Sequence, residues 1–123
     1  MQISSAREYF EAVTSRPHPE LSDASGTWEF DVEGAGSWWL MVDGGKMRVS
    51  DRPPPEPAKT RVRLTEAELL RLARGEGHEN LLTALLRGAL RVEGDLRFGQ
   101  KLESLLPLPE EAPGARPDEQ VNA

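Results

Sequence analysis

Residues 86–106 constrain the fold of this chain most, because three kinds of local structure must follow one another there. Positions 89–93 alternate small or apolar residues with charged ones, which is the period of a half-buried strand. Gly94 breaks the alternation, and Asp95 is a good N-cap for a helix. Apolar residues then recur at helical spacing, at Phe98, Leu102 and Leu105. We therefore expect a last strand, a tight turn and an amphipathic helix laid back across a sheet.

Gly99 lies inside that expected helix, where glycine costs about 1 kcal/mol relative to alanine. A glycine is useful there if another group must lie close against the helix backbone. Two interpretations are open. The helix packs tightly on the sheet at this point, or a ligand passes close to its backbone.

Three strands are predicted in the first half of the chain. Residues 27–33 alternate strictly between apolar and acidic side chains, and residues 37–42 are apolar on both faces. Glycines at 34 and 36 mark the turn between them. The Asp-Gly-Gly sequence at 43–45 is a strong hairpin signal, so residues 46–50 should return as a third strand.

A fourth strand is predicted over residues 60–64, and its charges suggest a neighbour. Arg61 and Arg63 should point outward, as should Glu29 and Asp31 on the first strand. Opposite charges on adjacent strands are favourable. We therefore expect the first and fourth strands to lie side by side.

Helices and one loop complete the expected elements. Capping-box patterns at 5–8 and 65–68 each open a helix, and Asn80 can cap a further short one rich in leucine. These two later helices are enough for a crossover between the fourth and fifth strands. Residues 51–59 contain four prolines, so they cannot form the interior of a sheet and are expected to be an exposed loop.

Composition limits the class of protein. A chain of 123 residues can bury a core as one domain, which we place at residues 1–106. The acidic, proline-rich tail at 107–123 is expected to be disordered. The net charge of −6 argues against a nucleic-acid partner. No apolar run reaches the length of a membrane span, which argues against stable membrane insertion. Residues 1–5 do not resemble a signal peptide, so the expected location is cytoplasmic.

Catalysis is not expected. The two histidines, His18 and His78, are isolated in predicted loops, and the chain has no cysteine. These residues do not make a metal site, and neither a nucleophile elbow nor a phosphate-binding glycine loop is present. We therefore expect a protein that is not an enzyme and that uses neither a metal nor another cofactor.

Several segments in order resemble the sterol carrier protein type 2 family. They are Phe30-Asp31-Val32, Ser37 to Gly45, Val62-Arg63-Leu64-Thr65, Glu68-Leu69, Leu72-Ala73-Arg74-Gly75, Arg87 to Asp95, and Lys101-Leu102. The resemblance covers roughly residues 27–106. It implies an α+β fold with a mixed five-stranded sheet in the order 3-2-1-4-5, helices on one face, and an apolar tunnel between sheet and helices. Members bind sterols, fatty acids, acyl-coenzyme A thioesters or phospholipids there without chemistry.

The side chains expected to line this tunnel are apolar or, at one position, absent: Trp28, Phe30, Trp38, Leu40, Val42, Met47, Leu69, Leu72, Leu82, Leu85, Leu86, Phe98, Gly99, Leu102 and Leu105. The second strand poses a question of parity, because an even-length hairpin loop would turn Trp39 and Met41 inward. The family pattern instead turns them outward, where they would form an apolar patch suited to a homodimer.

This chain departs from better-known members of the family. It is acidic, it ends without a peroxisomal signal, and its N-terminal helical part is short. Two hypotheses about function follow. The first is non-catalytic binding of a lipid or another apolar small molecule in the tunnel. The second is an interaction or accessory module with a filled core, which acts through a dimer or a partner surface. Copurified lipid would distinguish them.

Overall fold

The computed structural model describes residues 3–108. In chain order its elements are α1 (Ala6–Thr14), the 3-10 turn η1 (Pro19–Leu21), β1 (Ser25–Glu33), β2 (Gly36–Asp43), β3 (Lys46–Ser50), β4 (Thr60–Thr65), α2 (Glu66–Ala73), η2 (Glu76–His78), α3 (Leu81–Leu86), β5 (Leu90–Gly94), α4 (Leu96–Gln100) and η3 (Lys101–Ser104). All five strands lie where the sequence patterns predict them, and none of their ends differs from the prediction by more than two residues. Among the described residues, no helix is long and apolar enough to cross a bilayer.

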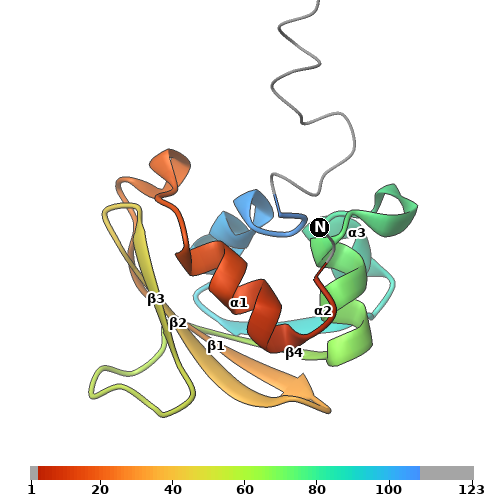
Figure 1. The fold of residues 1–123 in the computed structure, drawn as a ribbon, viewed down its shortest axis with the longest axis horizontal. Coiled ribbons are helices and arrows are strands. Elements are labelled where there is room, and N and C mark those ends of the chain that lie inside the picture. The colour runs from red at the N-terminus through yellow and green to blue at the C-terminus, as the bar shows by residue number, and fades with distance from the viewer. Residues whose placement is uncertain (1–2, 109–123) are drawn as a thin grey trace, which may run out of the picture.

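The strands form one sheet in the order β3-β2-β1-β4-β5, which confirms the expected topology. Only β1 and β4 run parallel; the other three pairs are antiparallel. The helices lie on one face of the sheet, and the loop after β3 projects from the other (Figure 1). This arrangement confirms the α+β class. It also means that each strand needs apolar side chains only on the face beneath the helices.

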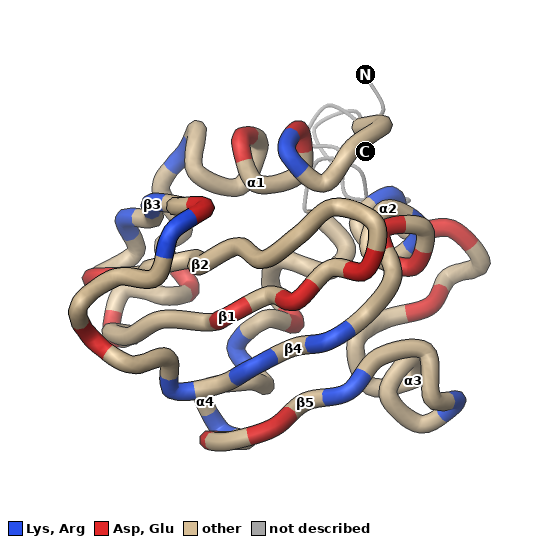
Figure 2. The backbone as a smooth tube through the Cα atoms, turned by 90° about the horizontal axis from the view of Figure 1, so that it is seen from below, with Lys and Arg blue, Asp and Glu red and all other residues tan. Residues whose placement is uncertain are grey.

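Charged side chains on the outer face join β1 to β4, as the sequence predicts. Arg61 lies 3.1 Å from Glu29, and Arg63 lies 3.6 Å from Asp31. Figure 2 shows the acidic positions of β1 running beside the basic positions of β4. Both pairs are partly exposed, so each contributes modestly to stability, but together they favour this pairing of strands over others.

The hairpin between β2 and β3 has a two-residue loop. Asp43 pairs with Lys46, which leaves Gly44 and Gly45 as the loop, with φ of 61° and 88°. Positive φ at both central positions is typical of a type I′ turn, the form that matches the twist of the flanking strands. The Asp-Gly-Gly signal therefore sets the register of the sheet edge.

Each of the capping boxes predicted for α1 and α2 forms only one of its two reciprocal hydrogen bonds. The N-caps Ser5 and Thr65 accept the backbone N–H groups of Glu8 and Glu68, at 3.1 Å in each case. The carboxylate of Glu8 instead accepts from Ser4, and that of Glu68 pairs with an arginine. The helices begin where predicted, because the N-cap bond alone satisfies an orphan amide.

The C-terminal helix is shorter than predicted. Asp95 caps α4, but after Gln100 the chain tightens into η3. Phe98, Leu102 and Leu105 are nevertheless all buried. The apolar side chains predicted to share one helix face are thus all buried, although the α-helix itself ends before Leu102 and Leu105.

Packing continues beyond residue 106, the predicted end of the domain. Leu106 and Leu108 are buried, and the Leu108 amide donates to the Ala73 carbonyl at 3.0 Å. Residues 107 and 108 therefore pack with the rest of the domain. The remainder of the predicted disordered tail, residues 109–123, lies outside the described residues.

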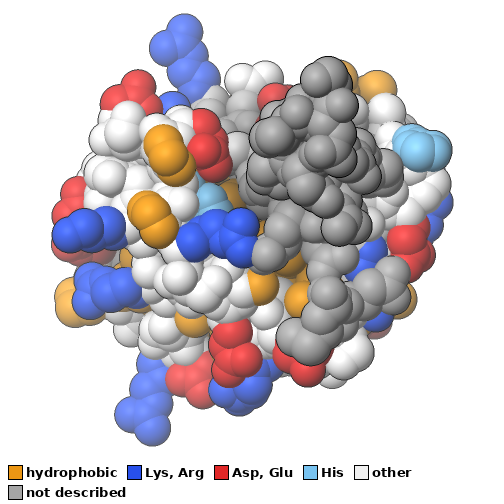
Figure 3. Space-filling view, turned by 45° about the horizontal axis from the view of Figure 1, so that its top comes forward, with side chains coloured by type: hydrophobic (Ala, Val, Ile, Leu, Met, Phe, Trp, Pro, Cys, Tyr) orange, Lys and Arg blue, Asp and Glu red, His pale blue; other side chains and the backbone are white. Residues whose placement is uncertain are grey.

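On the face drawn in Figure 3, charged groups of both signs alternate with scattered hydrophobic ones.

Candidate functional site

The face of the sheet beneath the helices is the candidate binding surface. Trp28, Phe30 and Leu40 have no exposed area on this face. Trp38 and Val42 are also buried there, whereas Trp39 and Met41 are half-buried on the outer face. The family pattern therefore predicts the parity of β2 correctly.

One aromatic pair fastens α4 to β1. The rings of Trp28 and Phe98 are stacked, with 4.4 Å between centroids and 19° between planes. The Trp28 indole N–H donates to the Phe98 carbonyl at 2.8 Å. A buried tryptophan needs a partner for this N–H, and here the backbone of α4 supplies it.

A second aromatic cluster lies beneath α1. Phe10 packs edge-to-face on Phe30 and on Tyr9, each with 5.1 Å between centroids, and stacks on Trp38. The Tyr9 hydroxyl donates to the Leu105 carbonyl at 3.1 Å. Burial raises the pKa of Tyr9 far above its usual value, so the hydroxyl stays protonated and keeps this bond. The cluster ties α1 to the sheet and to the C-terminal segment.

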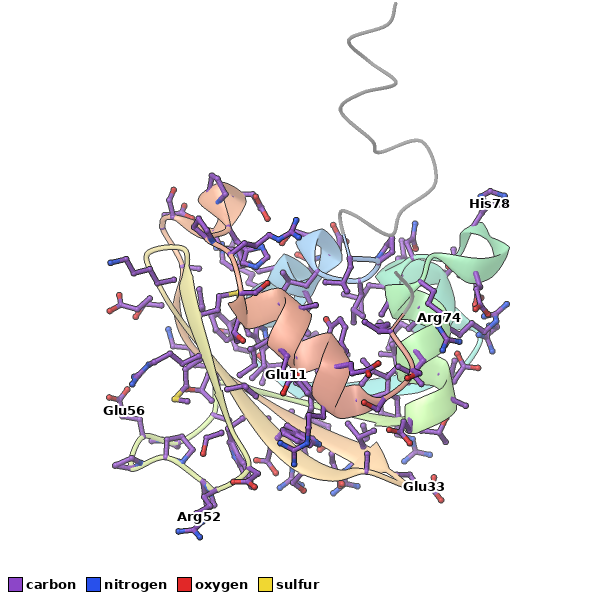
Figure 4. The ribbon with its side chains drawn as sticks, in the orientation of Figure 1. Glu11, Glu33, Arg52, Glu56, Arg74 and His78 are labelled. Carbon is purple, nitrogen blue, oxygen red and sulfur yellow. The ribbon has the colours of Figure 1, made fainter. Side chains whose placement is uncertain are left out.

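Eleven of the fifteen expected lining residues meet in one apolar cluster of the interior. They come from the sheet, from α2 and from the C-terminal segment: Trp28, Phe30, Trp38, Leu40, Val42, Met47, Leu69, Leu72, Phe98, Leu102 and Leu105. Figure 4 shows side chains filling the space between α1 and the sheet. These residues lie where a ligand chamber was expected, but in this structure they pack against one another. Their role in ligand binding stays a prediction.

Gly99 packs closely on the sheet, which supports the first of the two interpretations of this residue. A Cβ at this position would lie 3.1 Å from Val92 Cγ1 and 3.2 Å from Thr60 Cγ2. The expectation of open space for a ligand beside Gly99 is therefore wrong. The missing side chain instead lets α4 approach β4 and β5.

Three of the expected lining residues face solvent. Leu82, Leu85 and Leu86 are 54%, 40% and 77% exposed, while α3 buries Leu81 and Ala84 instead. The physical reason is that α3 has leucines on two faces, and the small Ala84 allows the 81/84 face to approach its neighbours. The expectation that these three leucines point into the interior is wrong.

A hollow of about 830 Å3 lies at the edge of the sheet, outside this interior. The end of α1, the hairpin of β2 and β3, and residues 54–56 enclose it. Val42 and Met47 are the two expected lining residues that reach it. Its charged lining residues carry both signs: Arg16, Asp43, Lys46, Arg48 and Glu56. The hollow is therefore lined by both apolar and charged side chains.

Residues 51–59 do more than the exposed loop that their prolines predict. Prolines 53, 54 and 57 wall a second hollow, of about 450 Å3, over Trp39 on the outer face of the sheet. Met41 likewise lines the first hollow beside Pro54 and Pro55. The loop thus interrupts the flat apolar patch that was expected around Trp39 and Met41, and a homodimer through them stays a prediction. A stiff run of prolines after a strand was the sequence signal for this wall.

A third hollow lies on β4 and β5, at the end of this strand pair that is farther from the second hollow. None of the three hollows is lined by Trp28, Phe30 or Trp38. The expected tunnel is therefore not one of them.

The two histidines have separate surroundings. His18 is 2% exposed, and its Nε2 lies 2.6 Å from the Val13 carbonyl, so it joins η1 to α1. His78 lies at the tip of η2, away from the sheet (Figure 4). Within residues 3–108, no group of three or more metal-ligating side chains is placed to hold a metal ion.

Known proteins share this arrangement. The structure is similar to that of a stereoselective inverting sec-alkylsulfatase from Pseudomonas sp., with a TM-score of 0.66 and 21% identity over 80% of this chain and 16% of that one. It is also similar to a palmitated SCP2L2 from Aedes aegypti, with a TM-score of 0.61 and 16% identity over 83% of this chain and 94% of that one. At these identities the likeness shows the fold alone.

The sequence comparisons show the family. Over 106 residues the chain is 26% identical to a hydroxysteroid dehydrogenase-like protein 2 of Xenopus tropicalis. The match covers 84% of this chain, which spans only 25% of that relative's length. The sequence pattern of the SCP-2 sterol transfer family matches residues 9–107. This match begins within α1 and ends at Pro107, so it includes all five strands of the sheet. The chain belongs to the SCP-2 sterol transfer family.

Proposed function

We propose that this protein binds an apolar or amphipathic lipid between the sheet and the helices, without chemically changing it. The observation that carries the proposal is the continuous apolar interior formed by the sheet, α2 and the C-terminal segment, in a member of a sterol transfer family. The structural relative from Aedes aegypti is palmitated. A fatty acyl chain is therefore the first ligand class to test.

The way in is proposed to be the hollow at the sheet edge. Met47 is buried on the inward face and also lines this hollow, as does Val42. Methionine is unbranched and changes rotamer easily, so Met47 can move aside more readily than the stacked aromatic rings can. An acyl chain would pass inward there, and its polar head would remain among the charged side chains that line the hollow.

The free-energy gain of burying an acyl chain and the costs of binding it together favour moderate affinity. Burying ~350 Å2 of acyl chain yields about 9 kcal/mol gross, at ~25 cal/mol per Å2. Association itself costs several kcal/mol of that. Because the interior is closely packed, the ligand must also displace side chains. We therefore expect micromolar affinity with loose selectivity among apolar chains.

The polar groups support binding without catalysis. Thr60 and His18, two of the three polar residues buried in the described part of the chain, face a backbone carbonyl: Thr60 Oγ1 donates to Asp95 at 2.6 Å, and His18 Nε2 lies against Val13. Among residues 3–108, every buried side-chain nitrogen or oxygen has a hydrogen-bond partner. The buried polar atoms therefore serve the hydrogen bonding of the fold itself.

The test is titration with a fluorescent fatty-acid analogue, followed by displacement with palmitate. We expect Met47→Trp to weaken binding about tenfold, because the larger ring blocks the way in. Met41→Trp is the matched control: it places the same ring on the same hollow, from the outer face of the neighbouring strand. Absence of binding to the wild type would contradict the proposal. Stronger loss in Met41→Trp would show that the ligand lies outside the sheet.

The close packing of the interior favours a second candidate function, that of an accessory module with a filled core. The matched region makes up only 25% of the Xenopus relative and 16% of the sulfatase, so this fold also occurs as part of longer chains. Native mass spectrometry of the purified protein, before and after organic extraction, separates the two candidates. Copurified lipid supports the carrier, and its absence together with failed titration supports the module.

A further inference from the structure

Three leucines on α3 form an exposed apolar patch that the proposed binding site does not use. Leu82, Leu85 and Leu86, here called the α3 leucine patch, belong to a helix of only six residues. In the described part of the chain, the only other exposed large hydrophobic residue is Leu96, which lies at the opposite end of β5. Exposed leucines are thus gathered on α3 rather than scattered.

The helix presents this patch on one side. The three positions follow the i, i+3, i+4 spacing of a single helix face. Asn80 and Thr83 cap α3 reciprocally, at 2.9 and 3.0 Å, and hold its first turn. Leu81 and Ala84 anchor the opposite side in the interior. The patch therefore cannot turn inward without breaking the packing of α3.

An ion-pair network behind the patch holds α3 against α2. Arg87 pairs with Glu79 at 2.5 Å and with Glu68 at 2.9 Å, and Arg71 pairs with the same Glu79. Two arginines and two glutamates cancel in formal charge. This ion-pair network therefore adds no formal net charge beside the patch.

The size of the patch decides which partner fits. Together the three side chains expose less area than two free leucines would, far below the ~800 Å2 per partner of a stable protein interface. Apart from three prolines, residues 109–123 contain a single aliphatic side chain larger than alanine, Val121, so their sequence offers no helical apolar stripe to cover the patch. A lipid surface needs no matching contour, and a few leucines are enough for brief contact.

We propose that the α3 leucine patch is a contact for zwitterionic lipid membranes, through which this protein exchanges its ligand. This inference rests on the proposed carrier function. The charge-balanced ion-pair network offers no excess of basic side chains, and the chain's net charge is −6, so a phosphatidylcholine surface is favoured over an anionic one. The contact is shallow and reversible, because it inserts only three side chains.

The experiment follows flotation of the full chain with phosphatidylcholine vesicles, and the rate at which a fluorescent fatty acid leaves those vesicles. The test variant is Leu82→Ser combined with Leu86→Ser, and the matched control is Leu96→Ser. We expect the test variant to lose about tenfold in vesicle association and transfer rate, while the control keeps both. Adding phosphatidylserine should not increase binding. Melting temperatures confirm that both variants fold.

Several results would overturn the proposal. Equal flotation of all variants, or binding that rises steeply with phosphatidylserine, would place the contact elsewhere. Self-association that is lost only in the test variant would identify a second copy as the occupant. Flotation that appears only in a chain ending at Leu108 would show that residues 109–123 cover the patch. Failure of the carrier function looks different: the soluble analogue is not bound, yet flotation still depends on the leucines.

Discussion

The indole of Trp28 stacks on Phe98 and donates a hydrogen bond to that residue's own carbonyl, 2.8 Å away. Helix α4 is thus held on β1, the central strand, by both ring packing and a hydrogen bond. We predict that Trp28→Phe lowers the free energy of unfolding by about 1–3 kcal/mol, through lost volume and the lost bond. Trp39→Phe, on the outer face, should change it by less than about 0.5 kcal/mol. Urea unfolding of both variants measures the difference, and equal losses would contradict this assignment.

Gly99 is predicted to tolerate no large side chain. In Gly99→Leu the new side chain would press on Val92 and Thr60, at a cost of about 1–3 kcal/mol. Gln100→Leu, at the exposed neighbouring position, is the control and should remain near wild-type stability. Denaturant unfolding and fatty-acid titration are measured on the same samples. A stable Gly99→Leu variant that loses affinity would show that a ligand does occupy the space beside Gly99.

Glu79 is predicted to make stability depend on pH in the acid range. Hydrogen bonds from Arg87 and Arg71 hold its pKa down at about 2, against a usual value near 4.5. A depressed carboxyl pKa stabilises the folded state above the unfolded value and loses that contribution as pH falls. Glu79→Gln should therefore lower the melting temperature by roughly a few degrees at pH 7. The difference from wild type should shrink between pH 4.5 and 2. A constant difference at all pH values would refute the assignment.

The two adjacent tryptophans of β2 are predicted to respond oppositely to charge. Trp38→Glu places an unpaired carboxylate in the interior and should prevent folding. Trp39→Glu leaves the carboxylate on the outer face and should preserve the fold. Circular dichroism distinguishes the outcomes. Sedimentation of Trp39→Glu against wild type then tests the predicted homodimer, which requires a change in molecular mass.

The end of the domain is predicted to lie after Leu108. A chain ending at Leu106 loses the buried Leu108 and its bond to Ala73, at about 2–4 kcal/mol and roughly 10 °C in melting temperature. A chain ending at Leu108 should melt within about 2 °C of the full chain. A large loss in the longer truncation product would mean that residues 109–123 pack on the domain.

The strands, the β2–β3 hairpin and the pairing of β1 with β4 were within reach of the residues themselves, whereas the place of β5 beside β4 was implied only by the family resemblance. Alternation marks β1 and β4, the Asp-Gly-Gly turn sets the hairpin of β2 and β3, and outward charges of opposite sign make β1 and β4 neighbours. Each of these signals is local or depends on one face of a strand, so it can be read before the interior is known. The parity of β2 is different. Because that strand is apolar on both faces, only the family pattern predicted that Trp38 turns inward.

The candidate site was predictable in composition but not in shape. In the strands that alternate, such as β1 and β4, the sequence alone determined which apolar residues point toward the helices. Tertiary structure decided that α3 buries Leu81 and Ala84 rather than its other leucines, that Gly99 presses on the sheet, and that the proline loop walls two hollows. The physical reason is that a short helix with apolar residues on two faces can bury either one. Which face it buries, and how much space is left over, depends on the contours of neighbours that are distant in the chain.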